Sequence, residues 1–178
     1  MDHLELIDKY YHDNNNLRSL LIRHSSDVAH KAMDIARRHP ELEIDTQFLF
    51  EAAMCHDIGI FKTDAPEIHC FGREPYMRHG ILGAELMRSK GWYRHALVCE
   101  RHIGAGLTKE EIRAQNLPLP PTDFVPVGTE EQIICFADCF FSKTKPTGEK
   151  TLGAVRIKMK KFGTRTLKQF DAWCELFL

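Results

Sequence analysis

Apolar residues recur along this chain at intervals of three and four, a spacing that predicts amphipathic helices. Alternating patterns of the kind that mark half-buried strands are scarce. The pattern therefore predicts an all-α fold, a compact helical bundle of seven or eight helices. The predicted helices cover about residues 2–11, 17–38, 47–57, 79–89, 92–102, 108–115, 130–143 and 152–177.

Helix boundaries are marked by capping and breaking residues. Asn14 to Asn16 can cap the second helix, which Pro40 stops, and Asp45 can cap the third, which Gly59 terminates. Residues 116–131 hold four of the eight prolines, which predicts an extended and fairly rigid connection. Buried-type residues continue after it, so we expect an excursion within one domain.

The composition of the chain narrows the functional classes to which the protein could belong. The 178 residues include 24 Lys and Arg against 25 Asp and Glu, a formal charge of −1 that argues against binding driven by electrostatics to nucleic acid or a membrane surface. No apolar run reaches the roughly 18 residues of a membrane span, and the first residues lack a signal-peptide pattern. A cytoplasmic protein is expected. The six cysteines form no C-x-x-C pair, which favours reduced, buried thiols.

Ionisable residues interrupt several apolar stripes. His24 stands on the stripe of the second helix, whereas His30 lies off it. His56 and Asp57 end the third helix, where a buried carboxylate and a negative helix end together favour a nearby cation. For His24, a core histidine satisfied by a backbone carbonyl is the simpler alternative.

Three further positions repeat the pattern. Asp138 lies in a helix that is apolar on nearly all sides, although an arginine partner would also explain it. His79 and His102 align with apolar residues of their own helices. Nitrogen and oxygen donors without thiolates suit a divalent transition metal, Fe, Mn, Co, Ni or Zn. Six donors would suit two ions that share Asp57 as a bridge.

These residues resemble the H…HD…D signature of the HD-domain metal-dependent phosphohydrolases, and CHDIG resembles the HDIG-type subgroup. RHGILGAE and ERHIGAGLTKEEI are similar to its two additional histidine segments. Small, uncharacterised single-domain proteins predicted to be HD hydrolases carry a stretch similar to PPTDFVPVGTEEQIICFADCFFSKT of this chain. The resemblance implies one HD domain over 1–178, with a core at about 17–145 and a C-terminal amphipathic helix at about 152–177.

The same resemblance implies a metal site. His24, His56, Asp57 and Asp138 would bind one ion, and His79 and His102 would hold a second. Ile60 stands where HDIG proteins often carry a lysine, no GYP motif follows, and the HD-x-x-ED pattern of alarmone hydrolases is absent.

The implied activity is hydrolysis of a phosphomonoester or phosphodiester by a metal-activated water. We expect a small phosphorylated substrate, by preference a nucleotide, with Asp57 also orienting the nucleophile. Positioned cations would assist, and the predicted ones are Lys62, Arg73, Arg78 and Arg101. Specificity is expected to reside in the loops at 60–78 and 116–129.

Three alternatives remain open in the sequence. A few HD-fold proteins resemble di-iron oxygenases that use the same six ligands, and others are non-catalytic nucleotide sensors. The basic C-terminal segment at 155–170 could bind nucleic acid, although a helix with solvated lysines is the simpler interpretation. The sequence leaves the oligomeric state unconstrained.

Overall fold

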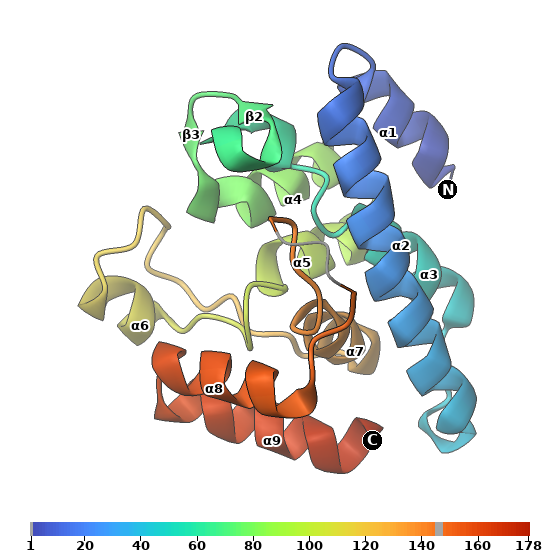
Figure 1. Cartoon of the computed structure of the whole chain (residues 1–178), viewed down its shortest axis with the longest axis vertical. Coiled ribbons are helices and arrows are strands. Elements are labelled where there is room, and N and C mark those ends of the chain that lie inside the picture. The colour runs from blue at the N-terminus through green and yellow to red at the C-terminus, as the bar shows by residue number, and fades with distance from the viewer. Residues whose placement is uncertain (1, 145–147) are drawn as a thin grey trace.

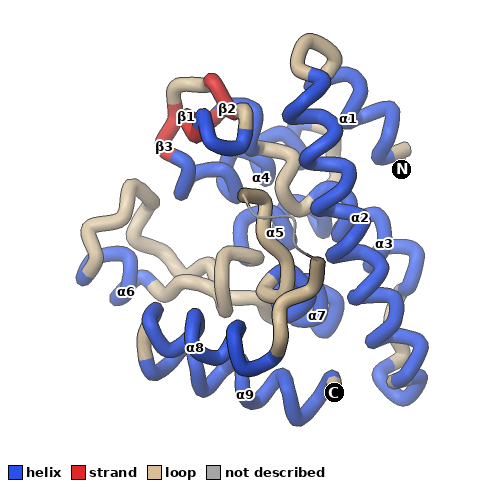
Figure 2. Tube along the Cα trace, viewed as in Figure 1, coloured by secondary structure: helices blue, strands red, loops and turns tan. Residues whose placement is uncertain are grey.

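The computed structural model describes residues 2–144 and 148–178 as a mostly helical bundle (Figures 1 and 2). The predicted core boundary at residue 145 lies outside the described residues. The helices are α1 (His3–Tyr11), α2 (Asn15–Arg38), α3 (Thr46–Cys55), α4 (His79–Ser89), α5 (Tyr93–Arg101), α6 (Lys109–Ala114), α7 (Thr129–Asp138), α8 (Leu152–Phe162) and α9 (Thr164–Phe177).

A small three-stranded sheet occupies the connection between α3 and α4. Its strands are β1 (Thr63–Ala65), β2 (Cys70–Phe71) and β3 (Glu74–Pro75), in the order β2-β1-β3. β1 pairs antiparallel with β2 and parallel with β3. Among the described residues, four 3-10 turns are also present, at Pro40–Leu42, Ile60–Lys62, Pro66–Ile68 and Tyr76–Arg78.

The arrangement centres on α7, which contacts α2, α3, α5 and α9. Two helix pairs pack closely beside it, α2 with α3 and α4 with α5. α8 and α9 lie side by side along the lower edge of the bundle in Figure 1. Segments far apart in sequence therefore meet around α7.

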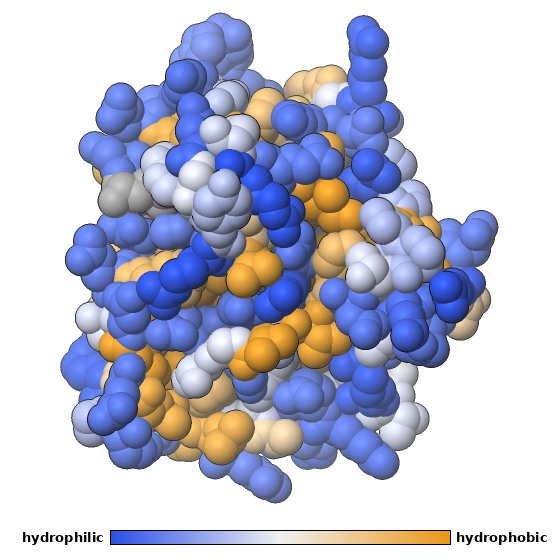
Figure 3. All heavy atoms as spheres, turned by 180° about the vertical axis from the view of Figure 1, so that it is seen from behind, coloured by the Kyte–Doolittle hydropathy of each residue, from blue (hydrophilic) through white to orange (hydrophobic). Residues whose placement is uncertain are grey.

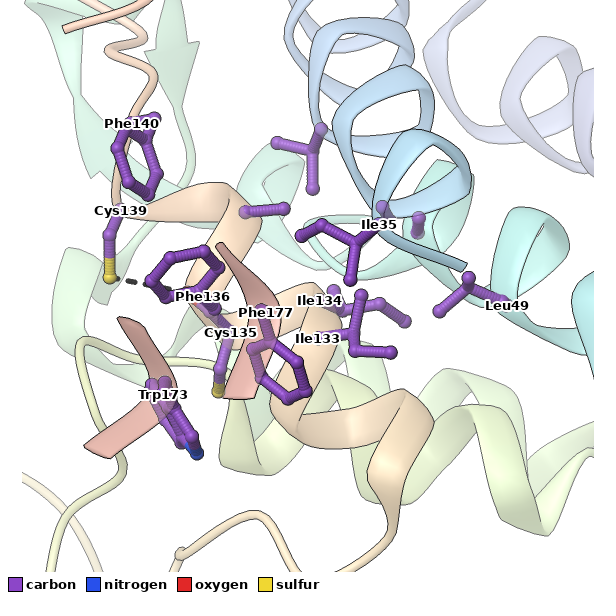
Figure 4. Packing of buried hydrophobic residues seen from close by; sticks show 14 of the residues in the cluster. Ile35, Leu49, Ile133, Ile134, Cys135, Phe136, Cys139, Phe140, Trp173 and Phe177 are labelled. Atoms are coloured by element: carbon purple, nitrogen blue, oxygen red, sulfur yellow. Dashed lines mark hydrogen bonds between the residues drawn. The ribbon is translucent and has the colours of Figure 1, made fainter. Parts of the chain in front are cut away.

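The main hydrophobic core surrounds α7 because that helix is apolar on nearly every side. Ile133 through Ala137 are fully buried. Figure 4 shows Phe136 and Phe177 close together, and their ring centroids are 5.6 Å apart. Trp173 is buried in the same cluster and donates its indole N–H to Gln132. The aromatic face of α9 thus fixes the C-terminal pair of helices to the bundle.

Most helix boundaries agree with the sequence predictions. Asn14 and Asp45 cap α2 and α3 through their side-chain oxygens, and α2 ends just before Pro40. The 152–177 helix is instead two helices, because Gly163 adopts φ 130°, a backbone conformation that a side chain disfavours. α7 also ends earlier than predicted, at Asp138.

Charged and polar side chains cover much of the surface, as the face turned away in Figure 1 shows (Figure 3). Large apolar side chains are nevertheless exposed, Phe71 and Val127 most of all. No helix among the described residues combines the length and apolar character that a membrane crossing requires.

The cysteines of the described structure are free thiols, and five of the six are buried. Burial raises the pKa of Cys55 to about 12 and that of Cys70 to about 11. Since the thiolate is the reactive form, we expect one thiol at most, the half-buried Cys174, to react slowly with a thiol reagent at pH 8. Ellman's reagent would measure this, with Cys174→Ser as the control. Rapid reaction of two or more thiols in the native protein would contradict it.

Candidate metal centre

The six predicted ligand residues come from five helices and meet at one place. His24 lies in the middle of α2, whereas the others lie at helix ends: His56 and Asp57 follow α3, His79 begins α4, His102 follows α5 and Asp138 ends α7. Five of these side chains are at most 5% exposed and Asp138 is 18% exposed. Helix ends let short side chains from different directions reach a common centre.

One half of the cluster joins His24, His56, Asp57 and Asp138. His24 Nε2 lies 3.2 Å from Asp57 Oδ2 and 3.0 Å from Asp138 Oδ1. His56 Nε2 lies 3.1 Å from Asp57 Oδ2 and 3.7 Å from Asp138 Oδ1. These four residues are the set that the sequence assigned to one ion.

The other half contains the two additional histidines. His79 Nε2 and His102 Nε2 lie 3.4 and 3.3 Å from Asp57 Oδ1, and 3.1 Å from each other. The two Asp57 oxygens therefore face different sides: Oδ2 faces His24 and His56, whereas Oδ1 faces His79 and His102. Asp57 stands where a bridging carboxylate would stand.

Backbone carbonyls determine which nitrogen of three histidines carries a proton. The Nδ1 atoms of His56, His79 and His102 lie 2.6, 2.7 and 2.7 Å from the carbonyl oxygens of Ala53, Tyr76 and Cys99. A carbonyl only accepts, so each Nδ1 must donate its N–H. In the neutral ring, the lone pair is then on Nε2, which faces the cluster. Metal-binding histidines are commonly oriented in this way.

The electrostatics of the cluster also favour a cation. Burial alone would lower the pKa of His56, but Asp57 and Asp138 outweigh burial and raise it to about 10. Burial lowers the pKa of His79 to about 3, so His79 is neutral at pH 7. Burial opposes ionisation of Asp57, yet Lys143 and His56 hold the pKa of its carboxyl well below the ordinary value. The two carboxylates of this buried site thus stabilise positive charge beside them.

Within the described residues, several buried polar atoms of the cluster form no well-oriented hydrogen bond, although charged groups lie close to them. They are both ring nitrogens of His24, His56 Nε2 and both oxygens of Asp57. Such atoms are costly unless something satisfies them. Ligand atoms of His24, His56 and Asp138 lie within 4.8 Å of one another, as do those of His56, Asp57 and His102. These residues fit a divalent metal ion in donor type, spacing and burial.

Lys143 is a further charged residue of the cluster, and it is not among the residues predicted from the sequence. Its Nζ lies 2.6 Å from Asp57 Oδ2, and its side chain is 13% exposed. Burial favours a neutral amine, but Asp57 and Asp138 outweigh it and raise the pKa of Lys143 above the ordinary value. The only sequence signal is its place five residues after Asp138, where the chain leaves α7.

Other predicted cations have partners of their own. Arg78 Nε lies 2.9 Å from Glu74, and Arg101 donates to Glu131 at 3.0 Å. The Lys62 ammonium lies 5.9 Å from the centre of the Phe61 ring. None of these three, nor Arg73, lines the cavity beside the cluster. Their catalytic role stays a prediction.

Gly59 lets the turn that follows α3 pack against α4. Its φ of −82° and ψ of −6° are accessible to any residue, and α3 has already ended at Cys55, so the expectation that Gly59 terminates this helix is wrong. A Cβ at Gly59 would lie 2.2 Å from the His79 carbonyl oxygen and 2.4 Å from the Gly83 nitrogen. The glycine is required for space, because it lets α4 bring His79 close to Asp57.

A cavity of about 330 Å³ opens beside the cluster. His79, His102 and Asp138 border it on one side, and Lys143 also lines it. The Tyr76 ring stacks on the His79 ring with 4.6 Å between centroids. A small ligand in this cavity would therefore reach the cluster directly.

Sequence comparisons identify several relatives of this chain. The chain is 36% identical over 128 residues to uncharacterized protein MJ0778 of Methanocaldococcus jannaschii, an alignment that covers 70% of this chain and 68% of that protein. Two further proteins are named tRNA (cytidine(56)-2'-O)-methyltransferase. The one from Picrophilus torridus is 36% identical to this chain, and the one from Thermoplasma volcanium is 33% identical to this chain. Those alignments cover 77% and 80% of this chain but 36% of each methyltransferase.

No solved structure matches the chain. The HD domain family matches residues 21–141, a segment that includes all six cluster residues. This family consists largely of metal-dependent phosphohydrolases, and the clustered histidines and aspartates fit its use of divalent metals. The chain belongs to the HD domain family.

Proposed function

We propose that this protein is a metal-dependent phosphohydrolase acting on a nucleotide or another small phosphate ester, either a phosphomonoester or a phosphodiester. The observation that carries the proposal is the convergence of histidine Nε2 atoms on the two oxygens of Asp57. We further propose that residues 1–178 act as one HD domain.

The cluster would hold one or two divalent transition-metal ions. His24, His56, Asp57 and Asp138 would bind one, and His79 and His102, with Asp57 as the bridge, would bind another. A metal ion bound there would supply Lewis acidity, which lowers the pKa of water from 15.7 toward about 7 and neutralises charge on phosphoryl oxygens. Fe, Mn, Co, Ni and Zn all accept this donor set.

The chain's own residues would prepare the reaction. Backbone carbonyls hold the His56, His79 and His102 rings in place, so their nitrogens need not reorganise. Asp57 stays ionised beside Lys143 and is placed to orient the nucleophile. Lys143 carries a positive charge at the edge of the cavity, where phosphoryl oxygens would lie.

A di-iron oxygenase is the second candidate, because the two-sided arrangement about Asp57 suits a pair of iron ions equally. The buried cation Lys143 favours an anionic substrate and therefore the hydrolase. The relatives named as tRNA methyltransferases match this chain over 36% of their own length, so their activity is not transferred to it. Their names do justify including RNA among the substrates tested.

The first experiment is metal analysis of the purified protein, followed by phosphate release from a panel of phosphate esters with each of the five metals. The panel includes nucleotides and short RNAs with terminal phosphates. With iron, the assay is run in air and without oxygen. Phosphate release that is independent of oxygen supports the hydrolase. Oxygen-dependent consumption of an organic substrate without phosphate release would replace it with the oxygenase.

A pair of substitutions on one helix tests the ligand assignment. We expect His24→Ala to reduce bound metal and phosphate release by at least about tenfold, since loss even of a group that supports a ligand costs 10–100-fold. His30→Ala, six residues away on the exposed face of α2, should retain both. Metal content per chain and initial rates provide the measurement. Equal metal content in the two variants would contradict the assignment.

A further inference from the structure

The cavity beside the cluster has a wall that lies outside the segment matched by the HD family. Lys158 and Phe162 of α8 and Thr166 of α9 line it together with His79 and His102. The family match ends at residue 141. The C-terminal pair of helices therefore supplies one side of the cavity at the proposed metal site.

Two ammonium groups border this cavity near Asp138. Lys143 lies against Asp57, while Lys158 has no carboxylate within ion-pair distance among the residues the structure describes. Both lysines also border an adjoining cavity of about 200 Å³, which shares Tyr76 and Asp138 with the first. Two ammonium groups therefore lie beside the Asp138 carboxylate where the two cavities meet, and Glu67 lines the smaller cavity as well.

Among the described residues that line the larger cavity, Glu111 is the one carboxylate besides Asp138, and Arg165 neutralises its charge. Arg165 Nε lies 2.8 Å from Glu111 Oε1, and its terminal nitrogen lies 2.9 Å from Oε2. Arg165 also donates to the Gly106 carbonyl at 2.6 Å, which holds the loop after His102 against α9. An anion in the cavity would therefore meet a Glu111 carboxylate whose negative charge is balanced by Arg165.

Apolar and neutral groups form the rest of the lining. Leu107, Leu117 and Phe162 are apolar, whereas Gln115 and Thr166 offer neutral hydrogen-bonding groups. Phe162 is 52% exposed at the rim, and the Lys158 ammonium lies 5.7 Å from the centre of its ring. A volume of about 330 Å³ is at the lower end of ligand cavities. The cavity suits a molecule of about mononucleotide size.

We propose that Lys143 and Lys158 bind the phosphoryl oxygens of a phosphate monoester, and that Phe162 and the α8–α9 wall accept its planar or apolar body. This inference rests on the proposed function, because it describes recognition at the same site. It assigns part of the specificity to residues outside the matched segment, in addition to the loops at 60–78 and 116–129, which contribute Tyr76 and Leu117 to the lining.

The test uses inorganic phosphate as the probe, with the full-length protein carrying the metal it holds as purified. We expect Lys158→Met to raise the dissociation constant of phosphate about tenfold, the loss expected for one charge-assisted hydrogen bond. Lys160→Met is the matched control, because it removes an exposed lysine of α8 that lies outside the cavity lining. Isothermal titration calorimetry measures both.

A second comparison distinguishes recognition of the phosphoryl group from recognition of the planar or apolar body of the substrate. Phe162→Ala should raise KM for p-nitrophenyl phosphate about tenfold while leaving the dissociation constant of inorganic phosphate within about twofold. Lys143→Gln should weaken phosphate binding as well, and its melting temperature is measured first because Lys143 is buried against Asp57.

The outcomes distinguish this inference from the proposed function. If no phosphate ester is hydrolysed but Lys158→Met still weakens phosphate binding relative to Lys160→Met, recognition stands and hydrolysis fails. If esters are hydrolysed and Lys158→Met behaves like Lys160→Met, hydrolysis stands and the two-lysine site is wrong. Weaker phosphate binding in both variants would indicate a general surface charge effect and would also overturn it.

Discussion

Asp57→Asn is expected to abolish metal binding and turnover while leaving the fold intact. The substitution preserves shape but removes the carboxylate whose two oxygens face the two halves of the cluster. An amide N–H would donate to a histidine Nε2 and repel a cation from the same place. Loss even of a group that supports a ligand costs 10–100-fold in metal affinity, so loss of a carboxylate that faces both halves should cost more than about 100-fold.

The control for this change is Asp64→Asn, which removes an exposed carboxylate in β1. Metal content, phosphate release and melting by circular dichroism are compared in the two variants. The expected result is a folded Asp57→Asn protein without metal or activity, beside an unchanged Asp64→Asn protein. Metal content and turnover within about threefold of the parent in Asp57→Asn would place the chemistry elsewhere.

Gly59→Ala is expected to have the largest effect on stability. The added methyl group would lie 2.2 Å from the His79 carbonyl oxygen and 2.4 Å from the Gly83 nitrogen. Both are backbone atoms, so a side-chain rotation cannot relieve the clash and α4 must move. Overpacking of a tight interior costs about 1–3 kcal/mol or more, and we expect the upper end, a fall in melting temperature of about 6–12 °C.

Gly153→Ala provides the matched control, since a Cβ there meets nothing within 4 Å. Gly153 lies in α8 with ordinary helical backbone, so alanine should stabilise the protein by up to about 0.5–1 kcal/mol. Thermal unfolding followed by circular dichroism measures both variants. A Gly59→Ala protein that melts at the parent's temperature would show that the turn after α3 is not held as closely against α4 as described.

Helices were predicted well from the sequence where the pattern of apolar residues repeats over several turns. α2 is an example, because its buried stripe, its Asn14 cap and the Pro40 stop all agree. Short elements carried too little pattern: β2 and β3 have two residues each, too few for alternation to appear. The break at Gly163 was visible only as a shift in the apolar spacing, which does not by itself distinguish a kink from two separate helices.

The site was predictable where polar residues interrupt an apolar face. The structure brings the six proposed ligands together, and their role as ligands remains a prediction to be tested. Lys143 could not be found in this way because it lies outside a helix, where no periodic face exists to be interrupted. Arg78 and Arg101 illustrate the opposite problem. They precede His79 and His102 directly, but adjacent helical residues point about 100° apart, and both pair with glutamates instead.

The meeting of five helices at a single centre has a consequence for the folding of the chain. An ion held by residues from His24 to Asp138 would act as a cross-link between distant segments, much as a disulfide joins two positions. Cross-links restrict the unfolded ensemble, and the restriction grows with the length of chain they enclose. Capture of the ion would therefore also stabilise the bundle against unfolding.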